Sequence, residues 1–160
     1  MGIELKAKLL EVQAIYEGII GPHRIIRTNI RGTFLLAREV AHRVRRGGAF
    51  VNFSSTVTRT HFPGFAAYAG SKAAVETAVA IFAKELRGRS ITVNAISPGP
   101  TATDLFLHGK PQEVVDHLAK LAPLERLGQP DDIAAAVAFL AGPDGAWING
   151  QTLRANGGII

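Results

Sequence analysis

Three short strand-like runs divide the chain and predict a parallel sheet. They lie near residues 49–54, 91–96 and 151–155 and read AFVNFS, ITVNAI and QTLRA. Short runs rich in apolar and β-branched residues are typical of buried strands. Helical patterns separate the runs, and the order strand, helix, strand, helix, strand predicts right-handed parallel crossovers. We therefore expect an α/β fold.

The helical patterns before and between these runs are long and have clear ends. One runs from Pro22 to Arg46 and stops at a glycine pair, and another spans about 66–87. Apolar residues on the first are Ile26, Ile30, Phe34 and Val40, and on the second Val75, Val79, Ile81, Phe82 and Leu86. Residues 105–124 predict short helices, and acids after Pro130 favour a further helix start.

Residues 1–21 predict an amphipathic helix of their own. Apolar residues recur there at three- and four-residue steps, at Leu5, Leu9, Val12, Tyr16 and Ile19. The segment Gly18 to Pro22 ends the pattern. At 160 residues the chain is expected to form one domain or part of one.

Tyr68, Lys72 and Ser55 suggest proton-transfer chemistry. Tyr68 and Lys72 are four residues apart on a predicted helix, so their side chains share a face. A tyrosine ionises near pH ~10, and a fixed cation beside it moves the pKa toward the working range. Ser55 lies thirteen residues before the tyrosine, where its hydroxyl could hold a carbonyl oxygen.

The pair of tyrosine and lysine is weak evidence alone, because a solvated helix with a surface lysine gives the same spacing. The context strengthens it. Ser55 ends one predicted strand, and the turn Ser97-Pro98-Gly99-Pro100 follows the next. Ligands bind outside the carboxyl ends of parallel strands. We therefore expect the serine and this turn to open onto the same side of the sheet.

From Arg24 to Ile160 the chain resembles the C-terminal part of a short-chain dehydrogenase/reductase. The matching segments are RTNIRGTF, VNFSS, YAGSK, ITVNAISPGPTATDLF, LGQPDDIAAAVAFLAG and INGQTLRANGG. Within that family it is most similar to bacterial β-ketoacyl carrier-protein reductases. The resemblance implies the C-terminal part of a Rossmann-type doubly wound parallel sheet. It also implies hydride transfer between NAD(P)H and a ketone or 3-oxoacyl substrate.

The same resemblance implies four catalytic residues. Tyr68 matches the acid/base, and Lys72 matches the lysine that tunes it and binds the nicotinamide ribose. Ser55 matches the serine that orients the carbonyl, and Asn29 the asparagine that holds a water in the proton relay. Asn29 could instead bond locally to backbone, as asparagine often does. Ser54 and Ser55 could be ordinary strand-end hydroxyls.

Further residues match cofactor-binding positions of the family. Pro98 and Gly99 match the turn beside the nicotinamide. Thr101 matches a residue whose backbone amide meets the carboxamide, and Thr103 a threonine near the carboxamide or phosphates. Both threonines could also be helix caps, since Asp104 follows at a predicted helix start. Together with Tyr68 and Lys72, these residues form the expected nicotinamide end of the site.

The cofactor's phosphate cradle is missing from this sequence. Family members carry a TGxxxGxG turn at a helix N-terminus, and no glycines here have that spacing. The N-terminal βαβ half is thus missing or replaced by the helix at 1–21. We expect weak NAD(P)H affinity and an open edge on the first strand. The resemblance favours NADP, although the residues that select NAD or NADP belong to the missing half.

Two functions remain open: an oxidoreductase, or an inactive relic or assembly subunit of the same family. Retention of the four catalytic positions favours the first, and loss of the cradle favours the second. The resemblance also implies a homo-oligomer, formed through helices near 24–46 and 66–87. The lid region carries Leu105, Phe106 and Leu107, which suits an apolar or acyl carbonyl substrate.

Composition narrows the remaining classes. The chain has no cysteine, which excludes disulfides and thiolate metal sites, and its histidines lack metal-ligand spacing. The net charge is +5, but the basic residues are scattered, so nucleic acid is not an expected partner. No long apolar run or signal pattern occurs in the sequence. We expect no membrane contact, no metal and a cytoplasmic location.

Overall fold

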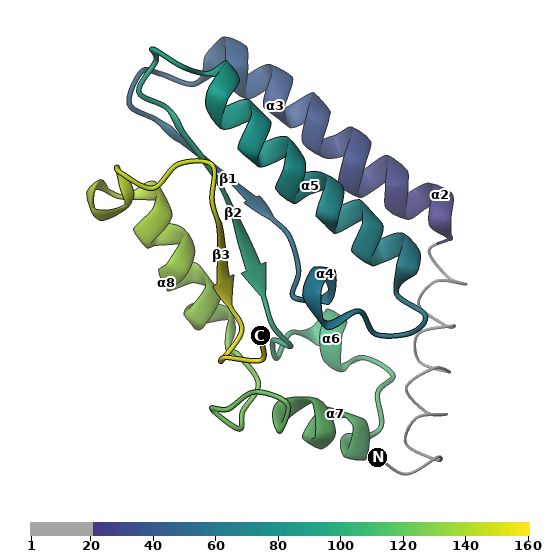
Figure 1. The fold of residues 1–160 in the computed structure, drawn as a ribbon. Helices are drawn as coiled ribbons and strands as arrows, with labels where there is room; N and C mark the ends of the chain where they lie inside the picture. The colour runs from purple at the N-terminus through teal and green to yellow at the C-terminus, as the bar shows by residue number, and fades with distance from the viewer. Residues whose placement is uncertain (1–20) are drawn as a thin grey trace.

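The computed structural model describes residues 21–160, which form a three-stranded parallel sheet with helices on both faces (Figure 1). The strands are β1 (Ala49–Phe53), β2 (Thr92–Pro98) and β3 (Thr152–Ala155), in the order β1-β2-β3. Asn52 pairs with Ala95, and Ala95 pairs with Thr152. The α/β fold and all three strands expected from the sequence are confirmed.

Two long helices lie side by side on one face of the sheet and run in the same direction (Figure 1). The first member is continuous through α2 (Pro22–Ile25), a π-helical stretch (Ile26–Arg31) and α3 (Gly32–Arg43). The second is α5 (Ala66–Glu85). On the opposite face lies α8 (Pro130–Ala141), followed by a short 3₁₀ turn (Pro143–Gly145).

Each face of β2 has its own apolar core, because successive side chains point to opposite sides of a sheet. On the α5 side, Val93 and Ala95 pack with Val75 and Val79. On the α8 side, Ile96 packs with two residues of that helix, Ile133 and Leu140. These residues are buried, so β2 is covered on both of its faces.

The first long helix differs from its expected form. It ends at Arg43 rather than Arg46, and its stretch Ile26–Arg31 is π-helical rather than α-helical. A π-helical stretch changes which residues face the core. Ile26 and Phe34, on the apolar side of the expected helix, are 48% and 51% exposed in the single chain. Arg89 donates to the carbonyls of Ala41 and Val44 and so satisfies the end of this helix.

Short helices gather at the carboxyl ends of the strands (Figure 1). These are α4 (Val57–Thr60), α6 (Asp104–Leu107) and α7 (Gln112–Ala119). The short helices expected over 105–124 are thus confirmed. The amphipathic helix expected over residues 1–21 lies outside the described residues, apart from its last position.

β1 is the outer strand of the sheet in the part of the chain that the structure describes, since it pairs with β2 alone. Alternate residues of a parallel strand direct their backbone groups to opposite edges. Ser54, just past the strand, donates its N–H to Ile96 on β2. Phe53 therefore directs its carbonyl away from β2, toward the edge that the sequence led us to expect to be open.

Candidate active site

Helix α5 carries Tyr68 and Lys72 side by side at its first turns. The Nζ atom of Lys72 lies 5.7 Å from the centroid of the Tyr68 ring. The same Nζ donates a hydrogen bond of 2.9 Å to the carbonyl of Phe53, the last residue of β1. Burial lowers the pKa of Lys72 from its ordinary value. The Lys72 ammonium thus lies near the Tyr68 ring and is hydrogen-bonded to the end of β1.

Ser55 follows two residues after the carbonyl that Lys72 contacts. Its Oγ accepts a long hydrogen bond of 3.4 Å from the N–H of Val57. Its own carbonyl accepts from the N–H of Thr58 at 3.1 Å, at the start of the turn that leads into α4. The serine therefore lies at the carboxyl end of β1, on the side of the sheet where the tyrosine begins its helix.

Asn29 lies in the π-helical stretch and bonds across to α5. Its Nδ2 donates to the Oγ of Ser71 at 3.0 Å, and that hydroxyl donates to the carbonyl of Tyr68 at 2.7 Å. The Asn29 carbonyl accepts from the Thr33 hydroxyl at 2.7 Å. Its side chain thus does not bond to its own helix backbone. Asn29 is tied through one hydroxyl to the residue that carries the phenol.

The Pro98-Gly99 turn continues from the carboxyl end of β2. A Cβ atom at Gly99 would lie 2.9 Å from the Cα of Asn156, so this position has no room for a side chain. The Gly99 N–H donates to Ala155 at 3.0 Å. Thr101 bridges to Gly128, and its hydroxyl donates to the Gly99 carbonyl at 2.9 Å. The turn is therefore held closely against β3 and the segment before α8.

Thr103 is the N-cap of α6. Its Oγ1 accepts from the N–H of Phe106 at 3.1 Å, and its backbone is extended, as expected for an N-cap. The capping role considered for Thr103 is confirmed. Thr101 instead lies in the bridge to Gly128, and its role toward a cofactor stays a prediction.

Buried polar side chains adjoin the turn that the sequence resemblance matches to the nicotinamide end of a cofactor site. Within residues 21–160, Thr56 Oγ1, Ser97 Oγ and Asn156 Nδ2 are buried and have no hydrogen-bond partner. All three adjoin the turn, because Thr56 donates its N–H to Pro98 at 3.0 Å and Asn156 lies against Gly99. The sequence supplies no matching glycine-rich turn for the phosphates.

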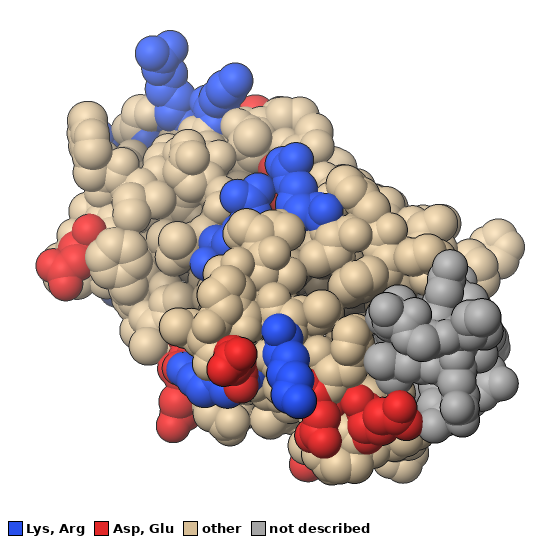
Figure 2. Space-filling view, turned by 60° about the horizontal axis from the view of Figure 1, so that its bottom comes forward, with Lys and Arg blue, Asp and Glu red and all other residues tan. Residues whose placement is uncertain are grey.

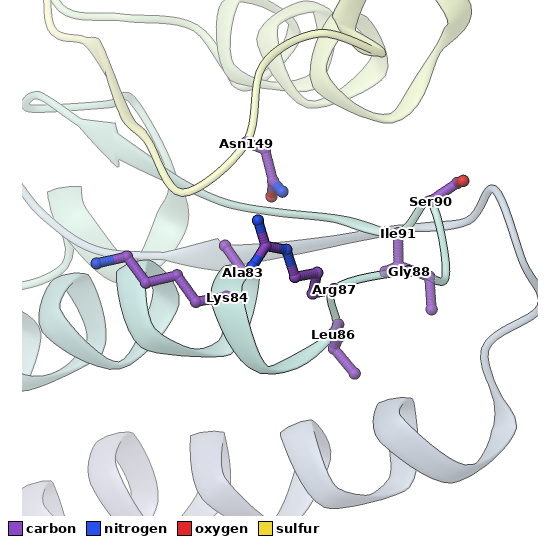
Figure 3. Close-up of a pocket in the computed structure, with 8 residues that line it drawn as sticks. All are labelled: Ala83, Lys84, Leu86, Arg87, Gly88, Ser90, Ile91 and Asn149. Carbon is purple, nitrogen blue, oxygen red and sulfur yellow. The ribbon is translucent and has the colours of Figure 1, made fainter.

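A cavity of about 600 Å³ lies at the opposite end of the strands, where α5 finishes and β2 begins (Figure 3). The guanidinium of Arg87 turns toward Asn149, while the side chains of Lys84 and Ser90 point elsewhere. Asn149 already uses its Oδ1 to accept from Val93 at 2.8 Å. The polar groups do not converge, so we assign no chemistry to this cavity.

Two residues that the sequence did not single out contribute to the site. Ser71 is buried and connects Asn29 to Tyr68. Glu76 accepts hydrogen bonds from the hydroxyls of Ser54 and Thr58, on either side of Ser55. The available signal was helical spacing, because Glu76 follows Lys72 by four residues, as Lys72 follows Tyr68.

The face at the carboxyl ends of the strands carries both signs of charge (Figure 2). Lysine and arginine are interspersed there with aspartate and glutamate, rather than forming one continuous patch. Over residues 21–160, no cluster of three or more histidine or acidic side chains suits a metal ion. No helix in that range is long and apolar enough to cross a membrane.

Known proteins resemble this chain over most of its length. A family profile described as "Enoyl-(Acyl carrier protein) reductase" matches residues 19–160. A "Short-chain type dehydrogenase/reductase" of Picea abies is 48% identical over 86% of this chain and 51% of its own. An Arabidopsis thaliana "NADPH-dependent aldehyde reductase-like protein, chloroplastic" is 47% identical over 82% of this chain and 50% of its own.

Solved structures agree with these relatives. A short-chain dehydrogenase/reductase from Serratia marcescens has a TM-score of 0.80 at 35% identity, over 86% of this chain and 56% of that one. An angucycline C-6 ketoreductase with bound NADP has a TM-score of 0.78 at 34% identity, over 86% and 55%. The chain spans about half the length of the curated relatives it matches. It belongs to the short-chain dehydrogenase/reductase family.

Proposed function

We propose that this chain carries the catalytic part of an NAD(P)-dependent reductase that acts on a ketone or related carbonyl compound. The observation that carries the proposal is the position of Lys72. Its ammonium lies 5.7 Å from the Tyr68 ring centroid and 2.9 Å from the carbonyl of Phe53. Phe53 precedes Ser55 by two residues. A cation, a phenol and a hydroxyl at the carboxyl end of a parallel sheet suit acid catalysis on a carbonyl oxygen.

Each residue has a distinct role in the proposal. Tyr68 donates a proton to the carbonyl oxygen as it gains negative charge, and the Lys72 ammonium stabilises the phenolate that remains. Ser55 donates a hydrogen bond to the same oxygen and fixes its direction. Asn29, held by Ser71, orients the path by which the phenol regains its proton. The nicotinamide cofactor supplies the hydride.

The cofactor in this proposal is NADP(H). One relative's name specifies NADPH and one solved ketoreductase contains NADP, which supports that choice. The nicotinamide end would lie at Pro98 and Gly99, with Thr101 and Thr103 nearby. Because the sequence lacks the glycine-rich turn, we expect this chain alone to hold the cofactor weakly.

The proposed substrate is an apolar ketone or a 3-oxoacyl group. Leu105 and Leu107 on α6 and Leu124 beyond α7 are exposed at the end of the sheet where the site lies. An apolar rim of this kind favours an acyl or aromatic carbonyl compound over a sugar. The 3-oxoacyl assignment follows the sequence resemblance, whereas the named relatives include aldehyde reductases and ketoreductases.

A homo-oligomer formed through α2–α3 and α5 remains part of the proposal. Exposed apolar side chains on these helices support it, namely Ile26, Phe34, Leu36 and Ile81. A cytoplasmic location is likewise the proposal drawn from the sequence.

A non-catalytic assembly subunit is the second candidate. The observation in its favour is the outer position of β1 within residues 21–160, together with the missing phosphate turn. Such a chain would keep the interface helices without turnover. It would retain Tyr68, Lys72 and Ser55 only as structural residues.

Deuteride transfer separates the two candidates. The chain is incubated with excess NADPH that carries deuterium on its nicotinamide and with an aromatic ketone, a β-ketoester or an aldehyde. The reductase proposal predicts deuterium on the carbinol carbon of at least one alcohol product, detected by mass spectrometry. A Tyr68→Phe variant should yield none. Absence of labelled alcohol from the parent chain at saturating cofactor would leave the assembly subunit as the better account.

A further inference from the structure

Glu76 lies on the same stripe of α5 as the two residues assigned to proton transfer. It follows Lys72 by four residues and Tyr68 by eight, so the three side chains project from successive turns. Lys72 directs its ammonium to the Phe53 carbonyl. Glu76 is therefore placed to serve the segment after β1, one turn further along the helix.

One carboxylate oxygen of Glu76 accepts hydrogen bonds from two hydroxyl groups. Ser54 Oγ lies 2.5 Å from Oε1 and Thr58 Oγ1 lies 2.9 Å from the same atom. Hydroxyl-to-carboxylate hydrogen bonds are short and roughly twice as strong as neutral ones. Ser54 is only 3% exposed, so its hydroxyl depends on this partner.

These two contacts bracket Ser55. Ser54 precedes it and Thr58 follows it by three residues, and both converge on Oε1. The Thr58 hydroxyl also lies 3.0 Å from the Ser55 carbonyl. A hydroxyl has one proton, so Thr58 donates to Glu76 or to Ser55 at a given moment, and either bond holds the turn.

We propose that Glu76 is a positioning residue that fixes the Ser55 hydroxyl relative to Tyr68. The proposal rests on the proposed function, in which Ser55 orients the carbonyl oxygen. Because Tyr68, Lys72 and Glu76 share one rigid helix, the helix that delivers the phenol also anchors the serine segment. Helix α5 alone then sets the distance between the Tyr68 phenol and the Ser55 hydroxyl, the two groups that contact the substrate oxygen. Without the carboxylate, the segment 54–58 loses its anchor to α5.

The test uses two replacements at this position in the full chain. Glu76→Gln keeps an oxygen that accepts both hydroxyls, whereas Glu76→Ala removes it. Thr77→Ala is the matched control, because Thr77 is the exposed neighbour on the same helix. Turnover is measured by deuteride transfer from saturating labelled NADPH. We expect Glu76→Ala to lower kcat by about 10- to 100-fold, as misplacement of a catalytic group does. Glu76→Gln and the control should stay within about threefold.

A double replacement tests whether the effect passes through the serine. If Glu76 acts by positioning Ser55, then Glu76→Ala adds no further loss of kcat in a Ser55→Ala background. Cofactor affinity should be unchanged in all of these variants. A full additive loss, or an unchanged kcat in Glu76→Ala, would overturn the proposal.

Amide hydrogen exchange tests the anchoring separately from turnover. Glu76→Ala should speed exchange at the amides of residues 56–60, while Glu76→Gln and Thr77→Ala leave it unchanged. Unchanged exchange in Glu76→Ala would contradict the anchor even if the protein is active. If Glu76→Ala exchanges faster but the parent chain shows no turnover, the anchor is supported and the proposed function is contradicted.

Discussion

The Lys72 ammonium donates a 2.9 Å hydrogen bond to the Phe53 carbonyl, joining α5 to the last residue of β1. That carbonyl points away from β2, and no described strand donates a hydrogen bond to it. Lys72 therefore satisfies this backbone group. The contact holds the cation beside Tyr68 and at the same time satisfies the strand end. One side chain therefore links the sheet to the proposed chemistry.

Burial of Lys72 predicts a pH-dependent stability. Because burial lowers its pKa in the folded state, the unfolded chain binds this proton more tightly. The free-energy cost of burying the charged Lys72 ammonium is greatest below its folded pKa. This cost is relieved as the pH rises to the ordinary lysine pKa of about 10.4. Relative to Tyr68→Phe/Lys72→Met, a Tyr68→Phe chain should gain free energy of unfolding over that range.

The Tyr68→Phe background removes the neighbouring phenol, so the comparison reports the lysine alone. Urea unfolding at a series of alkaline pH values measures the difference in free energy of unfolding between Tyr68→Phe and Tyr68→Phe/Lys72→Met. A difference that shrinks as pH rises would mean that the folded state favours the charged ammonium, contrary to this account.

The close approach at Gly99 predicts a steric defect. A methyl group there would lie 2.9 Å from the Cα of Asn156, and neither backbone can easily move. Gly99→Ala should lower the free energy of unfolding by about 1–3 kcal/mol, as overpacking does. The control is Gly70→Ala, whose Cβ meets nothing within 4 Å. That helical change should stabilise by about 0.5–1 kcal/mol, and equal effects in chemical denaturation would refute the close contact.

The ion pair at the start of α8 predicts an acid transition. Arg126 donates two hydrogen bonds to Asp132, which with a backbone bond from Gln129 lowers the pKa of Asp132 to about 2. A depressed carboxyl pKa contributes stability above its unfolded value of about 3.9, and that contribution is lost as pH falls toward the folded value. Carboxyl NMR titration should give the low midpoint, and Arg126→Gln should raise it. An ordinary midpoint in the parent would contradict the pairing.

Exposed apolar residues on α3 predict self-association. Leu36 is 60% exposed on the helix proposed as an interface. Leu36→Glu should shift the chain to a smaller species in light scattering coupled to size exclusion. Leu124→Glu is the control, because Leu124 is 65% exposed and lies outside both interface helices. A monomeric parent chain, or an equal effect of both replacements, would refute this interface.

The sequence predicted the strands and the start of α8 well, because these depend on local patterns. β1, β2 and β3 lie within two residues of the expected runs, and α8 begins at Pro130 as predicted. The π-helical stretch around Asn29 was not predicted, because no local pattern marks an extra residue in a turn.

The site was predicted only in part. Tyr68 and Lys72 share a face as their spacing required, and Thr103 caps α6. The links through Ser71 and Glu76 join segments far apart in the chain, so they depend on tertiary packing. Such contacts could not be derived from local spacing alone. The catalytic and cofactor-binding roles of the named residues stay predictions.

Turnover in matched variants tests the central claim most directly. Labelled alcohol formed from deuterated NADPH and a responsive carbonyl substrate is quantified for the parent chain, Tyr68→Phe, Lys72→Met and Ser55→Ala. The account predicts a measurable parent rate, a loss of about 100-fold or more on removal of the phenol, and large losses for the other two. A parent rate that Tyr68→Phe leaves unchanged would contradict it.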